Sequence, residues 1–172
     1  MKPSDPRLVT SDRLVLRHAI DADADFLVAL TNDADFLRFI GDRCLRTRED
    51  AVRYLHTGPF ARGASEIGLR VVVDGAGQPC GVCGLLQREG LDDVDLGFAF
   101  SPSHRGRGLA MEAAAAMLQH GLRQLQLPRV VAIVDPSNER SIALLAKLGM
   151  RFEREMRLAR DEKLLQLYVV QR

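Results

Sequence analysis

Glycine and positive charge come together in residues 105–110, which read RGRGLA and lie between a strand-like run and an alanine-rich segment. The first amide groups of a helix have no partner within the helix, and the helix dipole adds partial positive charge there. Gly106 and Gly108 permit positive φ and a close approach of the backbone to a ligand. The neighbouring Arg105 and Arg107 supply charge. The segment therefore predicts a site for an anion such as a diphosphate, with a solvated strand-to-helix turn as the alternative.

The spacing of this segment excludes two better-known phosphate loops. A Walker loop needs Lys followed by Ser or Thr after its last glycine, and none follows here. A dinucleotide fingerprint needs another glycine three residues after Gly108, whereas the next one is Gly121. The segment does match R-x-x-G-x-A, from Arg105 to Ala110. In this the chain resembles the GNAT superfamily of N-acetyltransferases, whose loop for the acetyl-CoA pyrophosphate reads Q/R-x-x-G-x-G/A.

Three further blocks extend the resemblance to about residues 8 to 170. RLVLR at 13–17 resembles the opening strand of the ribosomal-protein-N-acetyltransferase-like branch, and DLGF at 95–98 resembles its E-I-G-Y strand. NERS at 138–141 and LGM at 148–150 resemble its N-x-x-S and L-G-F segment. The resemblance implies an acetyl-CoA-dependent N-acetyltransferase. Such an enzyme moves acetyl directly, in a ternary complex, to the primary amine of a small molecule or of a protein N-terminus.

The resemblance also assigns the residues that bind acetyl-CoA. The residues expected at its pyrophosphate are Arg105, Gly106, Arg107, Gly108, Leu109 and Ala110. Pantetheine is expected along the backbone of Phe98, Ala99 and Phe100. In the family this strand splays from the next, here residues 130–134, and Gly97 suits a bulge that would produce the splay. The side-chain amide of Asn138 is a further expected contact, with helix capping as its alternative role.

One carboxylate and one hydroxyl are the catalytic candidates. Asp95 begins the strand that leads to residues 105–110, where some relatives place a glutamate that deprotonates the amine. The shorter aspartate predicts a bridging water, and its alternative reading is a solvated or lysine-paired carboxylate. Ser141 is the candidate acid, because many relatives use a tyrosine where this chain has LLA at 144–146. Weaker candidates for the base are Asp92, Asp93 and Glu66.

Periodicity and turn signals predict one domain over residues 1–172, of the α/β (α+β) class. Helical stripes run from about residue 21 to 60, and further helices are expected at 109–125 and 137–148. The resemblance makes the sheet a GNAT-like, mixed and mostly antiparallel one of seven strands, with helices on both faces. The expected strands are 8–17, 67–73, 80–87, 93–100, 130–134, 152–158 and 164–170.

Composition and charge exclude several other classes of protein. The net charge of +1 gives no case for nucleic acid or an anionic membrane as partner, and the apolar runs fall short of a membrane helix. The polar start of the chain lacks an apolar signal core, which predicts a cytoplasmic protein. An odd number of cysteines, Cys44, Cys80 and Cys83, favours free thiols. Cys80 and Cys83 are three apart on a strand and should face opposite ways, so no metal site is expected.

The acceptor should be bound by the helices of residues 22–60 and by the last hairpin, which flank the acyl end in the family fold. Asp42, Arg43 and Arg46 form a charged loop that could hold a carboxylate or phosphate of the acceptor, or be solvated. Arg160 stands near a position where the ribosomal-protein branch can carry a catalytic glutamate, which favours a different substrate. The rival function is a non-catalytic acyl-CoA-binding or sensing domain. A homodimer stays open.

Overall fold

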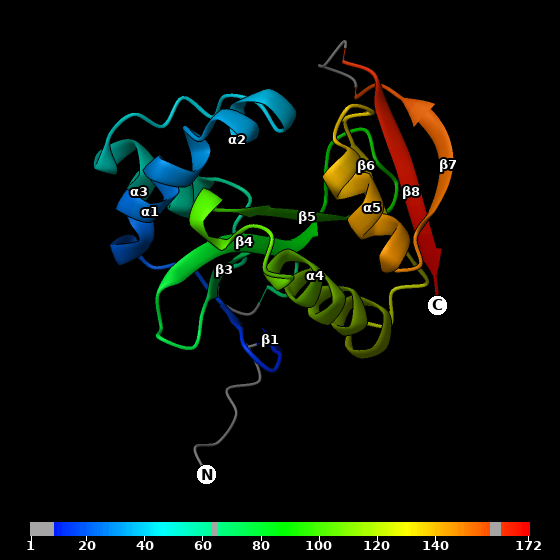
Figure 1. Ribbon diagram of the computed structural model, residues 1–172, viewed down its shortest axis with the longest axis horizontal. Helices are drawn as coiled ribbons and strands as arrows, with labels where there is room; N and C mark the ends of the chain where they lie inside the picture. Colours follow the sequence, from blue (N-terminus) through cyan, green and yellow to red (C-terminus); the bar gives the residue numbers. More distant parts are fainter. Residues whose placement is uncertain (1–8, 63–64, 159–162) are drawn as a thin grey trace.

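The chain folds around one mixed sheet, seen in a computed structural model that describes residues 9–62, 65–158 and 163–172 (Figure 1). Its eight strands follow the order β1-β2-β3-β4-β5-β6-β8-β7. Only β5 and β6 pair in parallel, and the other neighbours are antiparallel. The strands are β1 Val9–Thr10, β2 Val15–Arg17, β3 Gly68–Val73, β4 Pro79–Leu86, β5 Val94–Phe100, β6 Arg129–Val134, β7 Arg151–Met156 and β8 Leu165–Gln171.

The predicted mixed, mostly antiparallel sheet is confirmed, and it has one strand more than the seven expected. The extra strand arises because residues 8–17 do not run straight. The amide of Ser11 donates to the carbonyl of Leu14 at 3.0 Å, so the chain turns and Val9 pairs with Leu16. A small hairpin, β1–β2, therefore replaces the single opening strand.

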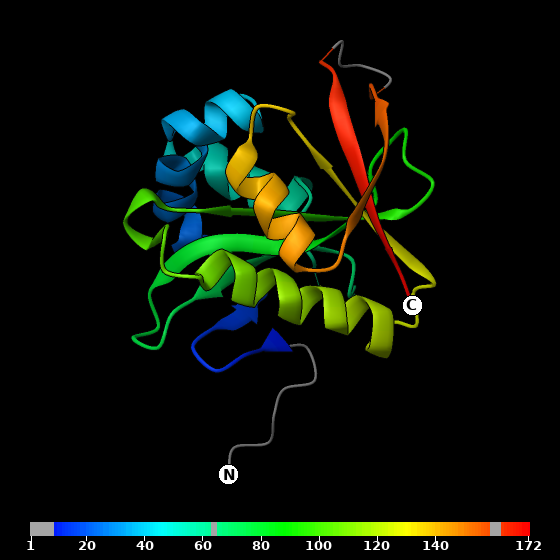
Figure 2. The ribbon, with the colours of Figure 1, turned by 45° about the vertical axis from the view of Figure 1, so that its right-hand side comes forward.

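Helices cover both faces of the sheet, as predicted (Figure 2). Helices α1 (Ala24–Thr31), α2 (Ala34–Phe39) and α3 (Arg48–Thr57) supply one buried cluster with Val71, Val73 and Val82. The other cluster joins α4 (Leu109–Gln119) and α5 (Glu139–Lys147) to the opposite side of the sheet. Alternation of side chains along β3 sends neighbouring valines to the two different clusters, since Val72 belongs to the second one.

Cys80 and Cys83 lie in the same buried cluster, so the prediction that they face opposite ways is wrong. The reason is a bulge, because Val72 pairs with Gly81 and Val73 pairs with Pro79, which leaves Cys80 as the extra residue. Burial raises the pKa of Cys80 to about 11 and also raises that of Cys83. Among the described residues, no three His, Cys, Asp or Glu side chains gather as a metal site would require.

The helices that the structure describes are all too short or too polar to cross a membrane.

Candidate active site

A wedge opens where β5 and β6 stop pairing. Their parallel ladder contains only Val94 with Val130 and Asp95 with Val131. Beyond Asp95, β5 continues alongside β4 as far as Phe100, while β6 continues alongside β8 as far as Val134. Each strand thus follows its own antiparallel partner. The wedge is the splay that the resemblance implies for the strand expected to hold pantetheine.

No bulge at Gly97 produces this wedge, so that expectation was wrong. The pairing of β4 with β5 runs without a break from Gly81 with Phe100 to Leu86 with Asp95. Gly97 instead lies where space is short, because a Cβ there would come within 3.0 Å of the Leu86 side chain. The splay therefore comes from the strong antiparallel pairing on the two outer sides.

The predicted anion loop sits at the mouth of the wedge and opens α4. Gly106 has φ +72° and Gly108, the N-cap residue of α4, has φ +76°, both in the left-handed region that favours glycine. The first hydrogen bond of this helix runs from the amide of Glu112 to the carbonyl of Gly108 at 3.1 Å. The amides of Leu109 and Ala110 precede that bond and have no partner within the helix. They form the helix N-terminus at which an anion is favoured.

Arg105 holds this loop in place with its side chain. Its Nε donates to the carbonyl of Phe100 at 2.9 Å, and its two terminal nitrogens reach Asp35 at 2.9 Å and Asp33. Burial alone would raise the pKa of Asp33, but the hydrogen bonds from Arg105 and from the amides of Phe36 and Asp35 lower it. The charge of Arg105 is thus compensated by α2, and what this residue offers to a ligand is mainly a fixed backbone.

Glu112 braces the same loop from the other side. Its carboxylate accepts from the hydroxyl of Ser11 at 2.6 Å and from the amide and Nε of Arg13 at 2.8 and 2.6 Å. The guanidinium of Arg13 in turn donates to the carbonyl of Arg107 at 3.1 Å. The side chain of Arg107 is exposed and lies outside the lining of the cleft described below. The β1–β2 hairpin therefore fixes the start of α4.

Asp95 lies at the apex of the wedge and is neither solvated nor paired with a lysine. It is only 1% exposed. One carboxylate oxygen accepts from Nε of Arg88, and the other accepts from the amide of Ile133 at 3.3 Å. Burial raises the pKa of Asp95, although Arg88 and the Ile133 amide act in the opposite direction. Asp95 thus joins the two diverging strands by satisfying an amide of β6 that the splay leaves unpaired.

Asn138 and Ser141 stand together at the start of α5. Asn138 is the N-cap residue, and its Oδ1 accepts from the amide of Ser141 at 3.2 Å. Within the described part of the chain, nothing accepts from Nδ2 of Asn138, and the hydroxyl of Ser141 has no hydrogen-bond partner. Capping and ligand contact are therefore compatible for Asn138, since each uses a different atom.

These elements enclose one large cleft with a volume of about 1130 Å³. Ten of the predicted contact or catalytic residues line it together with Asp95, and Arg107 is the one that does not. The ten are Phe98, Ala99, Phe100, Arg105, Gly106, Gly108, Leu109, Ala110, Asn138 and Ser141. The cleft is larger than a typical small-ligand pocket and suits an extended ligand. None of the weaker candidates for the base lines it: Glu66 binds Arg70 and His120, Asp93 binds Arg129, and Asp92 lies outside.

The sequence did not point to three residues of the cleft wall, which are Arg38, Arg88 and Asp135. Arg88 follows β4 and binds Asp95, while Asp135 follows β6 and binds Nζ of Lys163 at 2.7 Å. Lys163 also donates to the carbonyl of Arg38 at 3.0 Å, which ties the last hairpin to α2. Asp135 and Arg38 both line the cleft. Residues 159–162, which include Arg160, lie outside the described part of the chain.

The family model described as acetyltransferase (GNAT) domain matches residues 13–151. The protein YkkB of Bacillus subtilis is 30% identical over 155 residues, covering 88% of each chain. Spermidine N(1)-acetyltransferase of Escherichia coli is 32% identical over 88 residues, which is 51% of this chain and 47% of that one.

Among solved structures, RimL, a ribosomal L7/L12 alpha-N-protein acetyltransferase in complex with coenzyme A, aligns with a TM-score of 0.78. The alignment covers 95% of this chain and 97% of that one at 17% identity, so this likeness concerns the fold. The match of the family model across most of the chain is what decides membership. The chain belongs to the GNAT acetyltransferases and is an acetyl-CoA-dependent N-acetyltransferase.

Proposed function

We propose that this enzyme moves the acetyl group of acetyl-CoA directly to a primary amine in a ternary complex. The splay of β5 from β6, which runs from a buried carboxylate to the glycine loop of α4, is the observation that carries the proposal. The unpaired backbone of β5, the glycine turn before α4 and the carboxylate of Asp95 lie along this one cleft, which supports the proposal. Acceptors among the relatives are ribosomal protein N-termini and spermidine. Either kind of acceptor presents a primary amine.

The cleft fits acetyl-CoA on its own features. Gly106 and Gly108 leave the amides at the start of α4 uncovered, and a Cβ at Gly106 would meet no atom within 4 Å. These amides would hold the pyrophosphate. The backbone of Phe98 to Phe100, unpaired on the side of the wedge, would hold pantetheine, with Nδ2 of Asn138 as a further donor.

Acetyl-CoA supplies an acyl group that is already activated as a thioester. We assign to Asp95 the removal of a proton from the acceptor amine. Because both its oxygens are engaged, by Arg88 and by the amide of Ile133, the proton would travel through a water. The raised pKa of Asp95, caused by burial, makes its carboxylate a stronger base than an exposed aspartate. We assign to Ser141 the supply of a proton to the departing sulfur.

The thiols of the chain support direct transfer without an acyl-enzyme. A thiol must ionise to act as a nucleophile, and burial raises the pKa of Cys80 to about 11. Cys83 is also fully buried with a raised pKa. Cys44 is exposed, but none of the three cysteines lines the cleft.

Release of CoA thiol, measured while acetyl-CoA and a panel of amines are varied together, tests this proposal. Direct transfer predicts double-reciprocal lines that intersect, whereas an acyl-enzyme predicts parallel lines. With an active amine, Asp95→Asn should lower kcat/KM by roughly 100-fold or more. Loss of the base as the pH falls through the raised pKa should give wild type an acid limb that this variant lacks.

Asp93→Asn is the matched control, because Asp93 is two residues away, binds Arg129 at 2.7 Å and lies outside the cleft. Its kcat/KM and pH profile should match those of wild type. An unchanged profile in Asp95→Asn would remove Asp95 from the chemistry and leave it a positioning role at the apex. Parallel lines would refute direct transfer.

A further inference from the structure

A second, small cavity of about 70 Å³ adjoins the large cleft on the side of α1 to α3. Both cavities are lined by Arg88 and by Gly97, Phe98 and Ala99 of β5, so they meet where the acyl end of the cleft is expected. Apolar side chains form most of the small cavity, and Tyr54 and Arg43 add polar groups. The ring of Tyr54 stands edge-on to that of Phe60, with centroids 6.0 Å apart. An acceptor that enters here would meet the backbone of β5.

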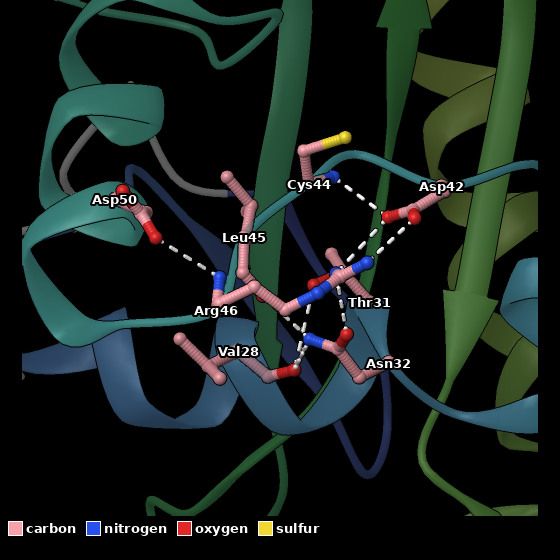
Figure 3. A network of polar contacts seen from close by, with 8 residues as sticks. All are labelled: Val28, Thr31, Asn32, Asp42, Cys44, Leu45, Arg46 and Asp50. Carbon is pink, nitrogen blue, oxygen red and sulfur yellow. Dashed lines mark hydrogen bonds and ion pairs between the residues drawn. The ribbon is translucent and has the colours of Figure 1, made fainter.

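The loop that carries Arg43 is held rigidly by its other charged residues (Figure 3). The guanidinium of Arg46 binds both carboxylate oxygens of Asp42, at 2.6 and 3.1 Å, and also reaches Oδ1 of Asn32 at 2.7 Å. Nδ2 of Asn32 donates to the carbonyl of Leu45 at 2.6 Å. The side chain of Leu45 is buried in the same cluster as the apolar residues of α1, and this burial anchors the loop in the core.

The backbone of this loop turns sharply on both sides of Arg43. Gly41 has φ +107° and Cys44 has φ +56°, and the left-handed conformation is uncommon for a residue with a side chain. The amide of Cys44 donates to Oδ1 of Asp42 at 2.7 Å, which helps to hold that turn. The position of Arg43 is therefore fixed by its neighbours, although none of them binds its side chain.

Of the charged residues in this loop, Asp42, Arg43 and Arg46, only Arg43 has no partner among the residues that the structure describes. It is partly buried, and it has no hydrogen bond or ion pair with any residue in 9–62, 65–158 or 163–172. Asp42, which precedes Arg43 in the chain, is engaged by Arg46, and Asp95 is engaged by Arg88. Burial raises the pKa of Tyr54 while Arg43 and Arg88 act in the opposite direction, so Tyr54 keeps its proton and can donate. The small cavity thus offers the guanidinium of Arg43 and the hydroxyl of Tyr54, whereas Asp95 compensates the charge of Arg88.

We infer that Arg43 binds the carboxylate of the acceptor, so that the substrate is a small amine bearing a carboxylate and a compact apolar body. The inference rests on the proposed function and names its substrate class. A guanidinium matches a carboxylate with two parallel hydrogen bonds, and Tyr54 can add a third. The positive charge of Arg43 disfavours a polycation such as spermidine. The small volume favours a substrate that ends in this cavity over a peptide that must continue through it.

Three acceptors compared in pairs test the inference: leucine, leucinamide and spermidine, each with acetyl-CoA. Leucine should exceed leucinamide in kcat/KM by roughly 30-fold, because only leucine offers Arg43 an anion. Arg43→Gln should abolish this preference while the affinity for CoA and the melting temperature stay near wild type. Arg43→Lys should keep part of it. Arg123→Gln removes an exposed positive charge outside both cavities and should change nothing.

A binding measurement separates this inference from the proposed function. Calorimetry with CoA-loaded protein should show leucine binding that is lost in Arg43→Gln and retained in Arg123→Gln. If no amine releases thiol but leucine still binds through Arg43, the proposed transfer fails and the carboxylate site stands. If thiol is released from leucinamide or spermidine as fast as from leucine, transfer stands and the inference is overturned. Absence of leucine binding in wild type overturns it as well.

Discussion

Gly108→Glu tests the placement of the pyrophosphate most directly. A residue with a side chain at φ +76° should cost about 1 kcal/mol of stability, because the left-handed region suits glycine. A Cβ at Gly108 would meet a single atom within 4 Å, Nη2 of Arg13 at 3.4 Å, so there is room for the new side chain. The main effect should therefore be electrostatic. A carboxylate about 5 Å from two phosphate charges costs roughly 1 to 2 kcal/mol in a water-like dielectric, or about 5- to 30-fold in the Kd of CoA.

Gly77→Glu is the matched control for this change. Gly77 has φ +77° and no atom within 4 Å of a Cβ, but it lies in the turn between β3 and β4 and outside the cleft. Both variants should lose about 1 kcal/mol, which lowers the melting temperature by roughly 2–4 °C in a chain of this size. Only Gly108→Glu should weaken the binding of CoA, measured as a rise in its Kd by calorimetry. Raising the salt concentration should reduce the difference in the Kd of CoA between the two variants, because salt partly screens the repulsion.

An affinity for CoA that stays at the wild-type value in both variants would refute this placement. The pyrophosphate would then lie elsewhere in the cleft, and the glycines would serve only the turn into α4. Equal loss of affinity in both variants would instead show that general strain, rather than local charge, governs binding.

Two further substitutions separate structural from binding roles. Asn138→Asp keeps an acceptor for the amide of Ser141 and removes the Nδ2 donor, so unfolding by urea should be unchanged while CoA affinity falls; if affinity holds, Asn138 is only a cap. Burial alone would raise the pKa of Asp135, but Lys163 and Ser137 lower it to about 2. Ionised Asp135 therefore stabilises the fold above its unfolded pKa near 4, and this stabilisation is lost as the pH falls through about 2. Asp135→Asn should lower the free energy of unfolding by about 2 kcal/mol at pH 7. Urea unfolding at decreasing pH should show that the difference in this free energy between wild type and the variant becomes smaller. A difference that does not change with pH would contradict the role of Asp135.

Most of the fold could be predicted because each element carries its own local signal. Alternating apolar residues indicated the strands, and α3 begins with a local capping box, in which Thr47 and Asp50 form both capping hydrogen bonds at 3.0–3.1 Å. The predictions were wrong where the pairing of one strand with another determines the local structure. The turn after β1 and the bulge at Cys80 depend on which strand lies alongside, and local periodicity contains no such information.

The end of α4 shows a similar limit. Apolar spacing predicted one helix to residue 125, but the α-helix ends at Gln119 and continues as a π-turn over His120–Gln124. The amide of Leu125 donates to the carbonyl of His120 at 3.0 Å, five residues back. Gly121 is buried against Leu85, where a Cβ would come within 3.0 Å of that side chain. The change from α-helical to π-helical hydrogen bonding thus occurs where the helix packs against β4, and the spacing of apolar residues along the helix does not indicate it.

In the candidate site, backbone features could be predicted and side-chain partners could not. The conformations of Gly106 and Gly108 follow from their type and place before a helix. The partners of Arg105 lie 70 and 72 residues away, on a helix whose docking no local pattern encodes. The sequence therefore suggested that Arg105 supplies free charge, whereas α2 compensates that charge.

The charged side chains around the cleft are mostly paired with each other. Arg105 binds α2, Asp95 binds Arg88 and Asp135 binds Lys163, so each pair fixes a wall and leaves little net charge for a ligand. Among the described residues, the groups left unpaired next to the two cavities include the backbone of the splay, the first turns of α4 and α5, and the guanidinium of Arg43. The first two suit a ligand common to the whole family, because they depend on the fold. Arg43 depends on one loop of this chain, and this is the position where a choice of acceptor can be encoded without disturbing the cofactor cleft.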